Sequence, residues 1–314
     1  MNTGRFLLAA LTASATLFAV GAAFYFSVPV VASNIEPQLR PPITHPDHHL
    51  VRQGNIRPMF PSREEWSFDT RHVGRRVVVY DRLDSTNDTA AGLAADPENA
   101  GVVVVADAQT AGRGQYGRVW NAPPGASLLM SVLLFPPVAL RRPVVLTALA
   151  AVAVAEAIRE RTGLQARIKW PNDLLLSGKK VCGILIEQGT GTVIGVGLNL
   201  NQSAADFDAT GLPDATSLAV AAGGWIDPTA VLAAVVRHLD DEYDRLLAGD
   251  VVPLEADWKW RVGLLGRQVV VETADGGTTV GRLREMSFEG LEIETGKAGF
   301  VAVRPELVRR VRPA

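Results

Sequence analysis

The sequence predicts an α+β fold in two parts, and two observations support this. Runs typical of strands alternate with runs typical of helices over residues 75–262, and short strands separated by turns follow over 263–314. The chain of 314 residues is long enough for about two domains, each able to bury a core. We therefore expect a larger mixed domain over 75–262 and a small β-domain over 263–314.

Six strands are expected in the larger region, because β-branched residues fit a pleated, half-buried surface. They cover residues 76–83, 102–106, 128–135, 167–170, 180–187 and 192–200. Two long helices are expected beside them. One runs from Pro143 to a stop at Gly163, and the other has an N-cap at Asp227 and a stop at Gly249. Apolar residues recur along both with a helical period, which predicts that they pack in the core.

The C-terminal region has the sequence pattern of a small β-barrel. Asp275-Gly276-Gly277 separates two alternating runs, 267–273 and 278–286, which is a strong hairpin signal. Further short runs of apolar and β-branched residues follow. Strands this short and this closely spaced favour a closed barrel.

Composition excludes several classes of function. The 31 basic and 33 acidic residues give a net charge of −2, so no global basic surface is available for nucleic acid. Cys182 is the only cysteine, which rules out an intrachain disulfide and a cysteine zinc cage. Three of the five histidines crowd a Pro-rich stretch outside any periodic element, so no protein metal site is expected. Cys182 lies in an apolar run and is interpreted as a core residue rather than a nucleophile.

The first 74 residues differ in composition from the predicted globular domains. Residues 1–32 form a hydrophobic segment, without a charge from Phe6 to Ala32, which suits a membrane span or a signal peptide. Residues 33–74 are expected to be a Pro-rich linker. A third interpretation is a misassigned start, with Met59 as the true first residue.

A glycine-rich loop is the most informative stretch. Residues 112–117 fit Gly-x-Gly-x-x-Gly and follow a predicted strand, as in a dinucleotide-binding turn. That turn must lead directly into a helix, whereas Val-Trp-Asn-Ala-Pro-Pro-Gly at 119–125 cannot start one promptly. The loop suits closure over an anionic ligand instead. Its glycines expose backbone N–H groups, and Arg113 and Arg118 can grip carboxylate or phosphate oxygens. The plainer interpretation is a polar surface loop.

Three further motifs carry polar side chains, although each alone also fits a cap, a turn or a surface. Pro171 ends a strand, and a turn at Gly178 predicts a return that brings Lys180 near Asn172 and Asp173. The glycines of the motif at 195–201 permit close backbone approach. The motifs are Asp-Ser-Thr-Asn at 84–87, Lys-Trp-Pro-Asn-Asp at 169–173 with Lys-Lys-Val-Cys-Gly-Ile-Leu-Ile-Glu at 179–187, and Gly-Val-Gly-Leu-Asn-Leu-Asn at 195–201.

Taken in this order, and with Ala-Thr-Ser-Leu at 215–218, these motifs resemble those of the biotin–protein ligases. The resemblance extends from about Val78 to the C-terminus. It implies a mixed β-sheet catalytic domain related to class II aminoacyl-tRNA synthetases and lipoate ligases, followed by a Src-homology-3-like barrel. Residues 1–75 contain no pattern for the helix-turn-helix repressor domain of many bacterial relatives, so the chain resembles the ligase-only type.

The resemblance also implies a reaction and a set of site residues. Biotin and ATP with Mg²⁺ would form biotinyl-5′-adenylate, and biotin would pass to a lysine of a biotin carboxyl carrier protein or domain. Residues expected to hold biotin are Ser85, Thr86, Asn87, Gln109, Arg113, Gly114, Gln115 and Lys180. Residues expected at the nucleotide are Arg118, Trp120, Lys169, Asn172 and Asn199. Catalysis would rest on Arg113, Lys180, Arg118, Lys169 and Asp173.

Several alternatives stay open at this point. A lipoate or octanoyl ligase or transferase of the same superfamily is the nearest rival, and a membrane-tethered binding protein without catalysis is a more distant one. No sequence-specific DNA binding is expected, whereas the resemblance leaves open a homodimer. Use of ATP implies a cytoplasmic catalytic domain, with a membrane anchor and membrane contact through 6–32 if that segment is translated. Gln115 departs from the family pattern, in which an arginine often follows the second glycine.

Overall fold

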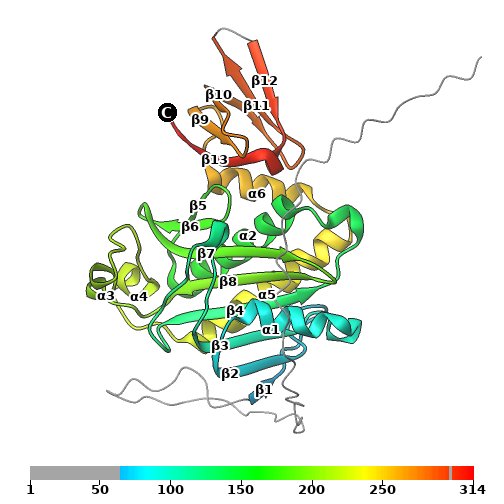
Figure 1. Ribbon diagram of the computed structural model, residues 1–314, viewed down its shortest axis with the longest axis vertical. Helices are drawn as coiled ribbons and strands as arrows, with labels where there is room; N and C mark the ends of the chain where they lie inside the picture. The colour runs from blue at the N-terminus through cyan, green and yellow to red at the C-terminus, as the bar shows by residue number, and fades with distance from the viewer. Residues whose placement is uncertain (1–63, 297–298) are drawn as a thin grey trace, which may run out of the picture. The chain divides into compact units, whose positions relative to one another are not determined.

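A computed structural model describes residues 64–296 and 299–314 of the chain (Figure 1). The expected hydrophobic segment over 1–32 lies outside these residues, as do Met59 and the expected linker up to residue 63. Within the range expected to be linker, Glu64–Trp66 form strand β1, which pairs antiparallel with β2. A three-residue strand is too short to show a period, so the sequence pattern missed it.

A large mixed sheet forms the centre of the fold, which confirms the predicted α+β class. Among the described residues its strand order is β1-β2-β3-β4-β8-β7-β6-β5. β2 and β3 run parallel and the other neighbours run antiparallel. The strands are β1 (Glu64–Trp66), β2 (Val77–Leu83), β3 (Val103–Gln109), β4 (Ser127–Leu134), β5 (Arg167–Lys169), β6 (Asp173–Leu176), β7 (Lys179–Gln188) and β8 (Thr192–Asn199).

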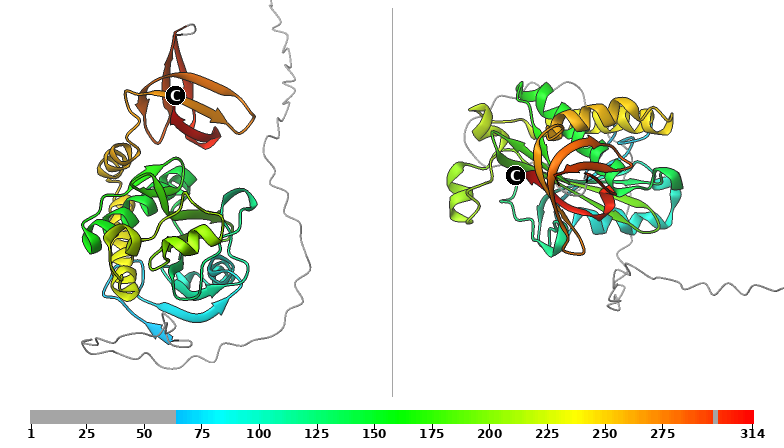
Figure 2. Two further views of the ribbon diagram at one scale, coloured as in Figure 1. Left: turned by 90° about the vertical axis from the view of Figure 1, so that its left-hand side faces the viewer. Right: turned by 90° about the horizontal axis from the view of Figure 1, so that it is seen from above.

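The two faces of this sheet bury different helices, because side chains alternate along each strand. Val77 and Val79 of β2 join the core with the long helices α2 (Pro143–Thr162) and α5 (Pro228–Leu247). Val78, between them, packs with Ala90 of helix α1 (Thr86–Gly92) on the opposite face. Figures 1 and 2 show α1 on one side of the sheet and α2 with α5 on the other.

The two long helices begin and end close to where the sequence predicts. α2 starts at Pro143 and ends at Gly163, whose φ of 74° is left-handed. α5 starts after Asp227, which accepts from the Thr229 N–H, and ends at Ala248, one residue before the expected glycine. The apolar stripe of α2 is core as predicted, but the helix is buried almost all round, because it lies between the sheet, α5 and α6 (Val252–Val262).

Further elements complete the larger region. Most are too short to show a period, and α6, although it has 11 residues, has a weak apolar pattern. α1 was interpreted only as an N-cap cluster, α6 was not predicted, and β6 is a four-residue strand. The remaining elements are α3 (Ala204–Ala209), α4 (Leu218–Ala222) and the 3₁₀ turns η1 (Leu93–Ala95), η2 (Pro97–Asn99), η3 (Gln115–Gly117), η4 (Val138–Leu140) and η5 (Pro305–Leu307).

The C-terminal region forms a second, five-stranded antiparallel sheet in the order β12-β11-β10-β9-β13. The predicted hairpin is present, since β9 and β10 pair across the Asp275–Gly277 turn. Its strands are β9 (Gln268–Thr273), β10 (Thr278–Met286), β11 (Leu291–Thr295), β12 (Gly299–Val303) and β13 (Val308–Pro313). In the described part of the chain, no helix combines the length and the apolarity that crossing a membrane requires.

Candidate active site

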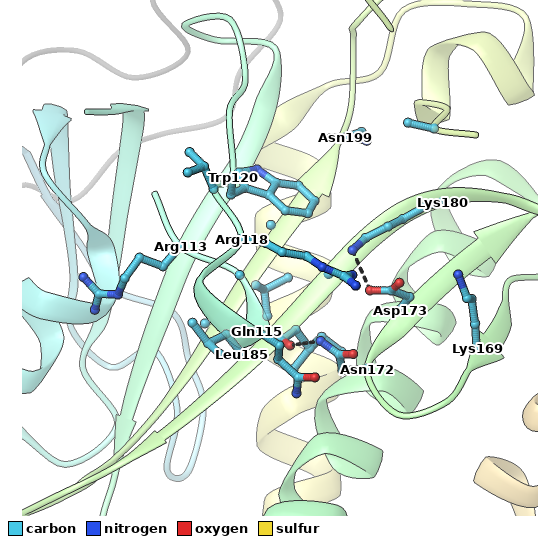
Figure 3. A pocket seen from close by; sticks show the side chains of 18 of the residues that line it. Arg113, Gln115, Arg118, Trp120, Lys169, Asn172, Asp173, Lys180, Leu185 and Asn199 are labelled. Carbon is cyan, nitrogen blue, oxygen red and sulfur yellow. Dashed lines mark hydrogen bonds and ion pairs between the residues drawn. The ribbon is translucent and has the colours of Figure 1, made fainter. Parts of the chain in front are cut away.

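The four polar motifs meet at one cavity of about 960 Å³. Its walls come from the start of α1, the glycine-rich loop, the 169–173 segment and the facing strands β4, β7 and β8. Every residue expected at the site lines this cavity, and Figure 3 shows many of their side chains. The lining members of that set are Ser85, Thr86, Asn87, Gln109, Arg113, Gly114, Gln115, Arg118, Trp120, Lys169, Asn172, Asp173, Lys180 and Asn199.

Hydrogen bonds fix the polar end of the cavity. The Thr86 N–H and hydroxyl donate to Gln109 Oε1, with distances of 2.7 and 3.1 Å. Ser131 Oγ donates to Asn87 Oδ1 (2.6 Å) and lies 2.7 Å from Thr86 Oγ1. Ser85 is the N-cap of α1 and is 3% exposed, yet its hydroxyl makes no capping bond. Its donor and acceptor capacity is therefore available to a ligand.

Glycines on β7 and β8 let the other walls approach the sheet, as the sequence predicts for β8. A Cβ at Gly195 would lie 2.2 Å from Asn87 Oδ1. A Cβ at Gly197 would lie 2.6 Å from the Trp120 ring, and one at Gly183 would lie 2.8 Å from it. The indole of Trp120 therefore packs directly against the backbone at Gly183 and Gly197. Its Nε1 is buried and has no protein acceptor.

The predicted return from Asp173 to Lys180 is confirmed. β6 and β7 pair so that Lys180 lies opposite Leu175, and its Nζ is 2.6 Å from Asp173 Oδ1. The ammonium also lies 5.5 Å from the centroid of the Trp120 ring, within range of a cation–π contact. The Lys180 side chain is 33% exposed and lines the cavity. In Figure 3, the side chain of Arg118 is directed toward this pair.

The glycine-rich loop is not a dinucleotide turn, because it leads into strand β4 rather than a helix. The loop closes on itself through the Trp120 N–H to Gly112 O bond (2.9 Å) and the Gly114 N–H to Arg118 O bond (2.7 Å). A Cβ at Gly112 would lie 2.5 Å from Trp120 O, which explains that glycine. The loop tip contains Tyr116, which has a left-handed φ of 58° and a ring 5.2 Å from the Arg309 guanidinium.

Arg113, which the resemblance implies closes the loop over biotin and the adenylate phosphate, lines the cavity and is paired with two carboxylates. Its guanidinium forms a bidentate pair with Asp88, with both N–O distances 2.6 Å, and lies 3.3 Å from Glu187. These bonds, with Asp88 the larger cause, raise the pKa of Arg113 further above its ordinary value. Figure 3 shows Arg113 apart from Lys180 and Asp173.

The remaining expected residues divide into lining and supporting positions. Lys169 is exposed at the cavity rim. Asn172 Nδ2 donates to Ile184 O (2.7 Å) and so holds the 169–173 segment against β7. Asn199 is 6% exposed, donates to Thr216 O (3.0 Å) and accepts from Gln202 (3.0 Å). Its amide is thus engaged within the protein.

Several lining or supporting residues were missed by the sequence motifs. Ser131 is a hydroxyl that interrupts the apolar run of β4 after Ser127 begins the strand, which is a signal that could have been found. Asp88 directly follows the first motif, and Glu187 ends the second. Arg309 and Arg310 of β13 also line the cavity, and the basic cluster at 309–312 was their only signal.

Two other chemistries receive no support from the side chains. Cys182 is fully buried, and burial raises the pKa of its thiol far above the usual range, so it is not a thiolate nucleophile. Within residues 64–296 and 299–314, no three His, Cys, Asp or Glu side chains gather in a way that could hold a metal ion.

Comparison with known proteins shows the class to which this fold and site belong. The Biotin/lipoate A/B protein ligase family matches residues 79–201. The bifunctional ligase/repressor BirA of Bacillus subtilis is 36% identical over 243 residues, 75% of this chain and 74% of that protein. The biotin–[acetyl-CoA-carboxylase] ligase of Paracoccus denitrificans is 32% identical over 243 residues, 74% of this chain and 96% of that protein. This chain therefore belongs to the biotin/lipoate protein ligase family.

Within the family, the similarity is to the biotin ligases. The biotin–[acetyl-CoA-carboxylase] ligase of Mycobacterium tuberculosis is 32% identical over 222 residues, 69% of this chain and 82% of that protein. The structure of the Aquifex aeolicus biotin protein ligase in complex with biotin and ATP superimposes with a TM-score of 0.66 at 26% identity. It covers 76% of this chain and 99% of that one.

Proposed function

We propose that this protein is an ATP-dependent biotin–protein ligase that forms biotinyl-5′-adenylate and transfers biotin to a lysine of a carrier domain. One observation carries the proposal. A single cavity joins a hydrogen-bonding end at Ser85, Thr86 and Gln109 to a cationic end at Lys180 and Arg118. That arrangement suits an acid with a polar head and a carboxylate that must meet a phosphate.

The polar end suits the ureido ring of biotin. Ser85 has an uncommitted hydroxyl, and the Gln109 amide is oriented by two bonds from Thr86. A ureido group presents one carbonyl acceptor and two N–H donors, which hydroxyl and amide groups can satisfy together. Asn87 is tied to Ser131 and Glu187, so we assign it a supporting role rather than direct contact.

The cationic end suits the adenylate. In the first half-reaction, a biotin carboxylate oxygen attacks the α-phosphorus of ATP, and the bond to the bridging oxygen of pyrophosphate breaks. Negative charge builds on phosphate oxygens during this step, and fixed cations stabilise it. Lys180 would meet both the carboxylate and the α-phosphate, and Arg118 would add a second charge. Trp120 would present its ring to the base, and Lys169 would lie at the rim.

Mg²⁺ enters this scheme with the nucleotide. Magnesium is commonly held by one or two carboxylates together with substrate phosphates. Asp173 and Asp214 both line the cavity, and Asp173 is available to a metal when Lys180 turns to the phosphate. In the second half-reaction, a carrier lysine amine attacks the acyl carbon of the mixed anhydride, and AMP leaves with the bonding electrons.

The domain assignment is part of the proposal. We assign 75–262 to a catalytic domain related to class II aminoacyl-tRNA synthetases and 263–314 to a Src-homology-3-like barrel. The mixed sheet and the five-stranded antiparallel sheet are the features that support this. The partner would be a biotin carboxyl carrier domain.

Calorimetric titration tests the choice of acid. Biotin should bind to the protein, whereas lipoate and octanoate at the same concentration should give no saturable heat. The polar end is the reason, because an apolar ring or chain would leave the Ser85 hydroxyl and the Gln109 amide N–H groups without a partner. Binding of octanoate or lipoate without binding of biotin would support the lipoate-class rival instead.

A further inference from the structure

Arg113 in the glycine-rich loop is paired with carboxylates from other parts of the protein. The guanidinium of Arg113 is the first charge in the loop, yet both of its terminal nitrogens bond to carboxylates on the α1 side. A fork-to-fork pair of this kind fixes geometry more strongly than a single ion pair. The loop is therefore tethered at this point to α1 and β7.

The tether connects to the buried floor of the cavity. Glu187 Oε2 also accepts from Asn87 Nδ2 at 2.6 Å, and Asn87 Oδ1 accepts from Ser131. Asn87 lies against Gly195, where a Cβ would come within 2.2 Å of it. A continuous set of hydrogen bonds thus runs from the loop to the polar end of the cavity.

We propose that Asp88 is a positioning residue that holds the glycine-rich loop over the biotin end through Arg113. In this arrangement Arg113 acts as an anchor, and the phosphate is left to Lys180 and Arg118. Glu187 is the second partner and links the anchor to Asn87. The proposal rests on the proposed function for its ligand but not for the tether itself.

The first experiment uses limited trypsin digestion of the full chain without ligands. Asp88→Asn keeps the size of the side chain and removes its charge, so cleavage after Arg113 or Arg118 should become about two- to fivefold faster, the range expected for loss of a partly exposed ion pair. Asp81→Asn, which neutralises an exposed aspartate on β2, is the matched control and should digest at the parent rate. Equal digestion of Asp88→Asn and the parent would overturn the tether.

The second experiment separates positioning from general damage. Asp88→Asn should raise the KM for biotin and speed release of biotinyl-adenylate by about two- to fivefold, with kcat at saturating biotin unchanged. A folding defect would lower kcat and leave KM alone. Asp88→Glu should recover most of the effect. The double variant Asp88→Asn/Arg113→Ala should change the KM for biotin and the release rate little more than either single variant does, because both substitutions remove the same ion pair.

The outcomes distinguish the two proposals. If the parent forms no biotinyl-adenylate, the proposed function fails, and the digestion result still decides the tether. If the parent forms it and Asp88→Asn retains it equally well, Asp88 is not a positioning residue. Slower release from Asp88→Asn would also overturn the proposal, because Asp88 would then compete with the phosphate for Arg113.

Discussion

Lys180 Nζ lies 2.6 Å from Asp173 Oδ1, and the two residues are brought together by the tight return between β6 and β7. The lysine therefore has a counter-ion within the protein, and its ammonium lies beside the Trp120 ring. Under the proposed function, a phosphate of the nucleotide would replace the carboxylate as its partner. A charge held in place in this way would contribute to rate.

Replacing Lys180 with methionine should leave the fold intact and slow adenylation by about 10²–10³, the usual cost of losing one charge from a site built for developing negative charge. Initial rates of biotinyl-adenylate formation measure this, with circular dichroism as the check on folding. The control is Lys179→Met, which removes the neighbouring exposed lysine and should stay within a few-fold of the parent. Adenylation by the Lys180 variant at a similar rate would show that another group neutralises the phosphate.

Gly197→Ala should disturb the nucleotide end of the cavity. The added methyl would lie 2.6 Å from the Trp120 ring, so the indole must shift, with a stability cost of about 1–3 kcal/mol. We expect the KM for ATP to rise at least about tenfold, with a smaller change for biotin. Gly189→Ala is the matched control, because nothing lies within 4 Å of a Cβ at that position. Unchanged ATP kinetics for Gly197→Ala would mean that Trp120 does not face the nucleotide.

Gln115→Arg should slow the escape of biotinyl-adenylate. Glutamine cannot make a charged bidentate contact, and one charge-assisted hydrogen bond is worth about 1.5–3 kcal/mol, or one to two decades in release rate. We expect Arg118 to compensate in part, so that the parent releases measurable adenylate without an acceptor and the variant releases less. Biotin affinity without nucleotide should be nearly unchanged. Equal rates of biotinyl-adenylate release from the parent and Gln115→Arg would show that position 115 does not contact the phosphate.

Cys182→Ala should retain full ligase activity at a stability cost of about 1 kcal/mol. The thiol is fully buried and its pKa is raised by that burial, so the reactive thiolate is absent at neutral and mildly alkaline pH. Iodoacetamide at pH 8 should label the folded protein slowly and the guanidinium-unfolded protein quickly. Inactivation by the reagent before unfolding would contradict a purely structural role.

Long periodic elements were the part of the fold that the sequence predicted well. The helix from Pro143 to Gly163 repeats its apolar residues over many turns, and the strands β2, β4, β7 and β8 are long runs rich in apolar or β-branched residues. Strands β1 and β6 and helix α6 lacked that signal, because three or four residues define no period and the apolar pattern of α6 is weak.

At the site, the motifs predicted which residues gather but not what each one contacts. Lys180 and Asp173 meet because a turn fixes their separation along the chain. The partner of Arg113 depends on how α1 and β7 pack across the sheet, and no local pattern in the loop encodes that distance. Ser131 shows the same limit, since its two partners are more than forty residues away along the chain.

Exchange of labelled pyrophosphate into ATP reports formation of an acyl-adenylate without any carrier protein, so it tests biotin activation by this protein on its own. We expect exchange that requires biotin, needs Mg²⁺, is lost in Lys180→Met and is not supported by lipoate or octanoate. Exchange supported by lipoate or octanoate but not by biotin would contradict the proposed function, as would the absence of biotin-dependent exchange in the folded parent protein.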